Sequence, residues 1–264
     1  KSPTNGLVDV YFFPGFMNEA LKFVRPVVSL DATHLRSEYK GTLYVASVLS
    51  GNNDVFPIGL MISSGNEDGA TWTKMLRLLK QASPILSGRS FVFISDRDKG
   101  LKAALDDVFP RNLEFSCAKH IESNVTQRFG KQCGRYVMAI AKTYSARNAA
   151  NMLDLVRQIK PSAAAYIESI ESGGVLWKCS QWIALQHSNL PPRYGIVTSN
   201  TSESVNNMFS EARDLAWMEA LEKIVDIMST RIGDCRTKYL KREDSEVVPR
   251  VAQILKARWD AAAS

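Results

Sequence analysis

Two aspartates stand directly after short, largely apolar segments that have the character of buried strands. Asp31 follows residues 27–30 (VVSL), and Asp96 follows residues 91–95 (FVFIS). If the two strands are neighbours in one sheet, the carboxylates meet at one edge, where protonation or a divalent cation relieves their repulsion. Alternatively, Asp31 stabilises a turn and Asp96 caps the helix that follows it. Asp98 is a rival ligand, but it lies two residues farther from the strand.

A third carboxylate, Glu203, belongs to the polar segment 199–207 at an expected helix start. Asn200 and Glu203 have the spacing of a capping box, which explains Glu203 without any catalytic role. The polar neighbours, with Asn206 on the next turn, favour instead a carboxylate that completes a three-acid metal site. Both interpretations remain open on spacing alone.

Cys117 and His120 form a single C-x-x-H motif after another expected strand. A structural zinc site needs a second pair of ligands, and the other cysteines and histidines have no suitable spacing. The motif therefore favours metal-free roles: packing for the Cys117 thiol, and a hydrogen bond from His120 to the acidic cluster or to a DNA phosphate.

Positive charge is concentrated between residues 121 and 150, in a chain whose net charge is +6. Several of these basic side chains would share one side of a helix, as a DNA-phosphate-binding face requires. The alternative is an ordinary solvated helix surface. The basic residues are Arg128, Lys131, Arg135, Lys142 and Arg147.

The elements that must position these residues follow from hydrophobic periodicity. β-branched and aromatic runs predict strands at 27–30, 43–49, 56–62, 91–94 and 113–117, and apolar spacing predicts helices at 70–79 and 101–109. The order βββαβαβ, with its first three strands as an antiparallel meander, predicts an α/β fold with a mixed sheet.

After Ile121 the pattern is helical, over 125–160 and 163–170. Trp177 and Trp182 lie among apolar residues there, which favours core positions over stacking on an unpaired DNA base. One long amphipathic helix is expected from Ser204 to Ile232, and a last one over 247–259.

Composition places the chain among ordinary globular proteins: 264 residues, 45% hydrophobic and 23% charged. No run of about 18 apolar residues occurs, and the first residues lack the apolar core of a secretory signal. We therefore expect neither a membrane span nor export. Four scattered cysteines are expected to be reduced thiols in an intracellular protein.

Several of these segments, spread over residues 7 to 210, resemble the Mutator-like (MULE) transposases, which belong to the DDE group and have an RNase H-like catalytic core. The order of the motifs is more specific than any one of them. The matching segments are Val28–Leu35 (VSLDATHL), Tyr39–Leu43, Phe56–Leu60 (FPIGL), Gly65–Trp72 (GNEDGATW), Ile94–Leu101 (ISDRDKGL), Cys117–Asn124 (CAKHIESN) and Thr201–Asn206 (TSESVN).

The resemblance implies that Asp31, Asp96 and Glu203 are the metal-binding triad, and that Cys117 and His120 form the family's C/D-x-x-H element near the active site. Two Mg²⁺ or Mn²⁺ ions would activate a water or a 3′-hydroxyl and stabilise the leaving 3′-oxygen. Residues 1–121 would then be the first part of the core, 122–195 an all-helical insertion, and 196–264 the C-terminal helices that complete the core.

The implied activity is cleavage and transfer of DNA strands at transposon ends. The expected partners are transposon-end and target DNA, with a homodimer or higher oligomer assembled on the DNA, no membrane, and a nuclear location. The family's zinc-binding modules before and after the core do not occur in this sequence, so a catalytic-core fragment is expected. Two alternatives remain: a domesticated, non-catalytic DNA-binding or transcription-regulating protein, and a nuclease of the same fold that only hydrolyses.

Overall fold

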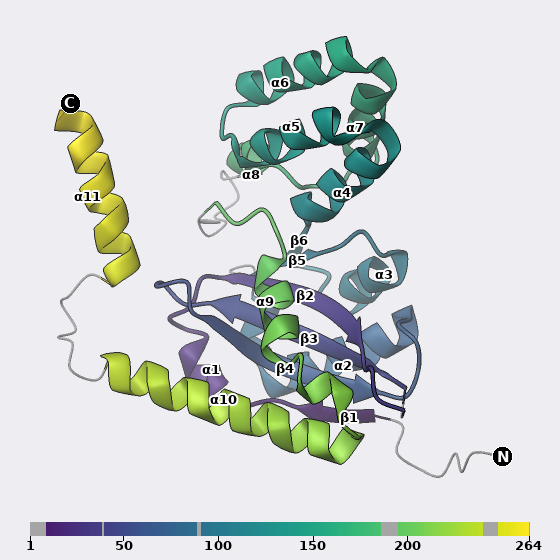
Figure 1. The fold of residues 1–264 in the computed structure, drawn as a ribbon, viewed down its shortest axis with the longest axis vertical. Coiled ribbons are helices and arrows are strands. Elements are labelled where there is room, and N and C mark those ends of the chain that lie inside the picture. The colour runs from purple at the N-terminus through teal and green to yellow at the C-terminus, as the bar shows by residue number, and fades with distance from the viewer. Residues whose placement is uncertain (1–8, 39, 89–90, 186–194, 240–247, 264) are drawn as a thin grey trace. The chain divides into compact units, whose positions relative to one another are not determined.

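The structure is a computed structural model and describes residues 9–38, 40–88, 91–185, 195–239 and 248–263 (Figure 1). Strands and helices both occur, which confirms the mixed α/β class. The chain forms two compact units. The first comprises Lys1–Arg25, Ala32–Glu67 and Thr201–Ser264, and the second Pro26–Asp31 and Asp68–Asn200. The domain boundaries expected at 121/122 and 195/196 stay a prediction.

A six-stranded mixed sheet has the strand order β1-β4-β3-β2-β5-β6. β4 pairs antiparallel with β1 and β3, whereas β5 pairs parallel with β2 and β6. Strand β1 is not among the strands predicted from the sequence, although it is as long as β5 and β6, which are predicted. The strands are β1 (Asp9–Phe12), β2 (Val27–His34), β3 (Thr42–Leu49), β4 (Val55–Ser63), β5 (Val92–Ser95) and β6 (Leu113–Ser116).

In the first unit, β3 and β4 form a hairpin closed by a turn over residues 50–54. The Ser50 N–H donates to the Asp54 carbonyl at 2.9 Å, and Asn53 has a φ of 68°, a conformation that asparagine tolerates better than most residues. The pairing register shifts where Ser47 faces Pro57. A proline has no N–H for the ladder, so an irregularity of this kind is where a strand accepts it.

The first unit also contains α1 (Met17–Ala20) and α11 (Pro249–Ala263). α9 (Asn200–Met208), the 3₁₀ helix η3 (Ala212–Asp214) and α10 (Trp217–Tyr239) bury apolar side chains against β3 and β4 (Figure 1). Their shared core with the strands consists of Leu35, Leu43, Val45, Leu60, Ile62, Val205, Phe209, Ala212, Ala220, Ile224 and Met228.

The single long helix expected from Ser204 to Ile232 is wrong, because the chain turns between α9 and α10. Arg36 stabilises this turn from outside the helices: its Nη2 donates to the Ser210 carbonyl at 2.6 Å, and its guanidinium pairs with Asp214. The hydrogen bond from Arg36 satisfies the Ser210 carbonyl, which therefore does not need a partner within a continuous helix. Hydrophobic periodicity cannot predict such a side-chain bond. The last helix, expected from Val247, is α11, and Val247 itself lies outside the described residues.

In the second unit, two capped helices follow β4 and β5. They are α2 (Gly69–Ala82) and α3 (Lys99–Val108). The short 3₁₀ helix η1 (Pro84–Ser87) follows α2. Asp68 accepts a hydrogen bond from Thr71 N–H at the start of α2, and Asp98 accepts one from Leu101 N–H at the start of α3. These are the N-cap bonds that aspartate forms best. They fix where each helix begins relative to its strand.

Five helices complete the second unit: α4 (Ala118–Phe129), α5 (Lys131–Lys142), α6 (Ala146–Ile159), α7 (Pro161–Ser172) and α8 (Cys179–Leu185). The predicted helical character of this segment is confirmed for the residues described between 122 and 185. Residues 186–194, with the Pro191-Pro192 pair, lie outside the described part. α4 ends at Gly130, whose φ of 98° suits glycine and separates α4 from α5.

Candidate functional site

Asp31 lies in β2, and Asp96 directly follows β5, the parallel neighbour of β2 in the sheet. Ser29 of β2 pairs with Ile94 of β5, and continuing this register by two residues sets Asp31 opposite Asp96. Adjacent strands are about 4.8 Å apart, and residues in register point to the same face of the sheet. The structure therefore brings these two carboxylates together, as the strand-end pattern predicted.

The capping alternatives for these two aspartates are wrong. β2 continues to His34, so Asp31 lies inside a strand and not in a turn. The residue that caps α3 is Asp98, whose side chain accepts the Leu101 N–H at 2.9 Å. Asp96 accepts only the backbone N–H of Asp98, at 3.2 Å, before that helix begins.

Cys117 and His120 reach the same region from the start of α4. Cys117 is the N-cap of α4, so its thiol and the side chain of His120 lie within one helical turn. The Cys117 N–H donates to the Ser95 carbonyl at 2.7 Å, which ties the start of α4 to the end of β5. The Ser199 N–H donates to Cys117 Sγ at 3.3 Å. The thiol is fully buried, as its expected packing role requires.

Electrostatics confirm that His120 is close to both aspartates. Interaction with the Cys117 thiol raises the pKa of His120 to about 9; partial burial opposes this rise, and the negative charges of Asp96 and Asp31 add to it. Burial raises the pKa of the Cys117 thiol, but hydrogen bonds with His120 and Ser199 outweigh burial and leave it lowered overall. His120 is therefore a cation at neutral pH, and its Nδ1 is buried without a partner among the described residues.

Glu203 and Asn206 lie on α9. Glu203 is exposed in the first turn, and Asn206 is half-buried one turn later. α9 begins at Asn200 itself, so Asn200 is its first helical residue and not the residue before it. Thr201–Ser264 belongs to the first unit and the two aspartates to the second, so the convergence of Glu203 with them stays a prediction.

The five basic residues are all exposed, but they do not share one helix. Arg128 lies on α4 and Arg147 on α6, because Gly130 ends α4 before the other three. Lys131, Arg135 and Lys142 share one face of α5, opposite its buried face. The expected common stripe is thus confined to α5, and DNA binding by it stays a prediction.

The two tryptophans are core residues. Trp177 and Trp182 are 0% and 1% exposed, and the Trp182 ring packs on Phe115 with centroids 5.3 Å apart. This confirms the core interpretation and removes both rings as platforms for an unpaired base.

Sequence analysis missed an arrangement beside Asp96. Arg97 Nη2 donates to the Tyr166 hydroxyl at 2.7 Å, and Arg128 lies over the same ring, with its guanidinium carbon 5.0 Å from the centroid. Arg97 and Tyr166 of α7 are 69 residues apart, so no local sequence pattern indicates their contact. The only available signal was that a basic residue immediately follows Asp96.

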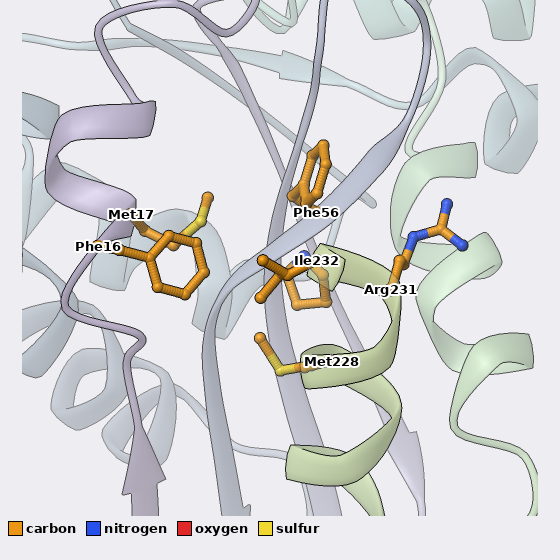
Figure 2. A pocket seen from close by; sticks show the side chains of 7 residues that line it. Phe16, Met17, Phe56, Met228, Arg231 and Ile232 are labelled. Carbon is orange, nitrogen blue, oxygen red and sulfur yellow. The ribbon is translucent and has the colours of Figure 1, made fainter. Parts of the chain in front are cut away.

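A separate pocket in the first unit is apolar (Figure 2). Its one polar side chain, Arg231, donates from Nε to the Val55 carbonyl at 3.1 Å. The pocket carries none of the groups that acid-base or metal chemistry needs. It is lined by Phe16, Met17, Phe56, Pro57, Met228, Arg231 and Ile232.

The donor set of Asp31 and Asp96 fits Mg²⁺ or Mn²⁺, since paired carboxylate oxygens are the ligands these ions prefer. Among the residues that the structure describes, no group of three or more His, Cys, Asp and Glu side chains is placed so as to hold a metal ion. All four cysteines are free thiols, consistent with the expected reduced state. In the described part of the chain, no helix is both long enough and apolar enough to cross a membrane.

Comparison with protein families finds a match to the MULE transposase domain over residues 27–124. No curated protein matches the chain. The matched segment contains both aspartates, together with Cys117 and His120, so it covers the part of the site that the structure assembles. The resemblance to Mutator-like transposases is thereby confirmed over residues 27–124, which match the MULE transposase domain.

Proposed function

We propose that this protein is a DDE-type transposase that cleaves DNA strands at transposon ends and joins them to target DNA with the help of divalent metal ions. One observation carries the proposal: Asp31 lies in β2, Asp96 directly follows the neighbouring parallel strand β5, and both carboxylates help to raise the pKa of His120 to about 9. Paired carboxylates at the edge of a mixed sheet are the arrangement an RNase H-like core would use. The antiparallel β3 and β4 and the parallel β2, β5 and β6 support that fold assignment.

Asp31 and Asp96 would hold Mg²⁺ or Mn²⁺ ions, with Glu203 as the third carboxylate and Asn206 in support. Bound ions of this kind lower the pKa of an attacking water or 3′-hydroxyl and stabilise a leaving 3′-oxygen. His120 keeps its proton at neutral pH, so its imidazolium adds a positive charge beside the two carboxylates. Cys117 maintains that protonation through its contact with the imidazole. The reaction requires no covalent protein intermediate.

The exposed basic face of α5 would hold the DNA backbone without reading its sequence. We extend the proposal to a nuclear protein that acts as a homodimer or higher oligomer on DNA, on the strength of its likeness to the transposase family.

The proposal is tested by comparing Asp96→Asn with Asp98→Asn. Cleavage of supercoiled plasmid and joining of an oligonucleotide 3′-hydroxyl to plasmid are measured in Mg²⁺ and Mn²⁺. Asp96→Asn should lower both activities together by at least 100-fold, since one metal site serves both steps. Asp98→Asn should retain most activity, because asparagine also caps helices. Loss of joining with full hydrolysis would contradict the shared site.

The third carboxylate is tested in the same assays with Glu203→Gln against Glu222→Gln, an exposed residue of α10. Glu203→Gln should weaken Mn²⁺ binding, measured by titration calorimetry, and lower both activities, whereas Glu222→Gln should change neither. A wild-type protein that binds DNA but performs neither reaction would instead indicate a domesticated DNA-binding protein.

A further inference from the structure

The side chain that follows Asp96 is held by the helical part of the second unit. Arg97 is half-buried, its Nη2 donates to the Tyr166 hydroxyl at 2.7 Å, and its guanidinium carbon lies 5.8 Å from the ring centroid. The ring itself is fixed by Phe129, with centroids 5.6 Å apart. Arg97 thus extends from the end of β5 to α7 in a defined orientation.

A second cation shares this ring. The guanidinium carbon of Arg128 lies 5.0 Å from the Tyr166 centroid, and Lys160 lies 5.7 Å from the centroid of the adjoining Phe129 ring. Three positive groups therefore surround two adjoining aromatic rings that are tilted by 45° to each other. Cation–π attraction offsets part of their mutual repulsion but does not neutralise the charge.

Neither arginine has a protein counter-ion among the described residues. Arg97 forms no ion pair there, and its Nε is buried without a hydrogen-bond partner. Lys102 of α3 differs, because it pairs with Asp106 and lies 3.6 Å from a Glu114 carboxylate oxygen. A buried guanidinium nitrogen without an acceptor costs free energy unless a ligand supplies one.

We propose that Arg97 binds a backbone phosphate of the DNA strand that enters the site of Asp31 and Asp96, with Arg128 contacting the backbone beside it and Tyr166 as the positioning residue. This inference rests on the proposed function, because it takes DNA as the substrate. A phosphate offers planar guanidinium groups the acceptors they lack here. It also supplies the negative charge that two adjacent arginines require.

Tyr166 acts through Arg97 and touches no substrate itself. Its hydroxyl accepts from Nη2 and leaves Nη1 for the phosphate, while its ring packs on Phe129. Tyr166→Phe removes the acceptor and keeps both the ring under Arg128 and the packing. The variant therefore changes the orientation of Arg97 while the packing that stabilises the helices of the second unit is kept.

The test is the salt dependence of binding to a fluorescein-labelled DNA duplex of arbitrary sequence, measured by anisotropy in EDTA so that no reaction occurs. Arg97→Gln and Arg128→Gln should each reduce the slope of log K against log salt by about 0.9, the value for one lost phosphate contact. Arg97→Lys keeps the charge, so it should retain nearly the wild-type slope and bind more weakly. Tyr136→Phe is the matched control, because Tyr136 lies 5.3 Å from Arg135 on α5 and does not contact Arg97.

Positioning by Tyr166 predicts non-additivity. Tyr166→Phe should weaken binding on its own, add nothing in an Arg97→Gln background, and remain additive with Arg128→Gln. Additive effects with Arg97→Gln would overturn the positioning role. A wild-type protein that fails to bind DNA would contradict the proposed function itself. If the wild-type protein binds DNA but Arg97→Gln leaves the slope of log K against log salt unchanged, only the proposed phosphate contact of Arg97 is overturned.

Discussion

His120 shows how one residue's chemistry depends on its neighbours. The pKa of His120 is raised to about 9, first by the Cys117 thiol and then by the charges of Asp96 and Asp31. A raised folded-state pKa means that the protonated imidazole stabilises the fold fully below about pH 6.5, and that this stabilisation is lost as the pH rises through about 9. Sequence could suggest the i, i+3 pair but not the direction or size of the shift.

Cys117→Ala should lower the titration midpoint of His120, because it removes the largest contribution to the raised pKa. The measurement is a pH titration of the imidazole resonances by NMR in metal-free buffer. Cys133→Ala is the control: Cys133 is also a buried thiol, but it lies in α5, and its loss should leave the midpoint unchanged. An unchanged midpoint in Cys117→Ala would mean that the carboxylates alone hold the proton.

Asp31 and Asp96 were predictable because each directly follows a short, largely apolar run of strand residues, which is a local sequence signal. Arg97 was not, because its partner Tyr166 lies 69 residues farther along the chain in α7. A contact of this kind arises from tertiary packing and leaves no local pattern.

At the scale of elements, α2 and α3 begin against each other. Gly69 and Gly100 approach so closely that a Cβ on Gly100 would lie 2.9 Å from the Gly69 nitrogen and 3.0 Å from Asp98 Oδ1. The approach holds the start of α3, and therefore the loop from Asp96 to Asp98, in place.

Gly100→Ala should destabilise the protein by about 1–3 kcal/mol, because backbone atoms must move to admit the methyl group. Gly233→Ala is the matched helical control: no atom lies within 4 Å of its Cβ, so the higher helix propensity of alanine should stabilise by up to about 1 kcal/mol. Urea denaturation of both variants checks the comparison. Equal stabilities would mean that the two helix starts are not tightly packed.

The strands from β2 to β6 were predictable because long β-branched runs survive any tertiary context. The break between α9 and α10 was not, because the bonds of Arg36 to Ser210 and Asp214 come from a distant part of the chain. β1 was also missed, and it pairs with β4 at the edge of the sheet. Elements with a local sequence pattern can therefore be predicted from the sequence more easily than features set by contacts with distant residues.

At the scale of the whole molecule, the segment that matches the family does not coincide with either compact unit. The match ends at residue 124, inside α4, and excludes β1, α9 and α10. The core of β3 and β4, however, needs Val205, Phe209 and Ile224 from the helices beyond the match.

A fragment of residues 27–124 should therefore fail to fold cooperatively, because it exposes the β4 edge and removes one side of this core. Thermal unfolding by circular dichroism and light scattering, with the whole chain as reference, provide the measurement. A sharp unfolding transition of the fragment in solution would show that the matched segment stabilises itself.

Strand β2 contributes residues up to Asp31 to one compact unit and residues from Ala32 to the other. Side chains alternate between the faces of a strand, so the loss of a single residue between Pro26 and Asp31 would turn the carboxylate to the opposite face while β5 kept Asp96 where it is. Insertions and deletions should therefore be tolerated in the turn at 50–54 and excluded from the first half of β2. Among related chains, that half-strand should vary in composition but never in length.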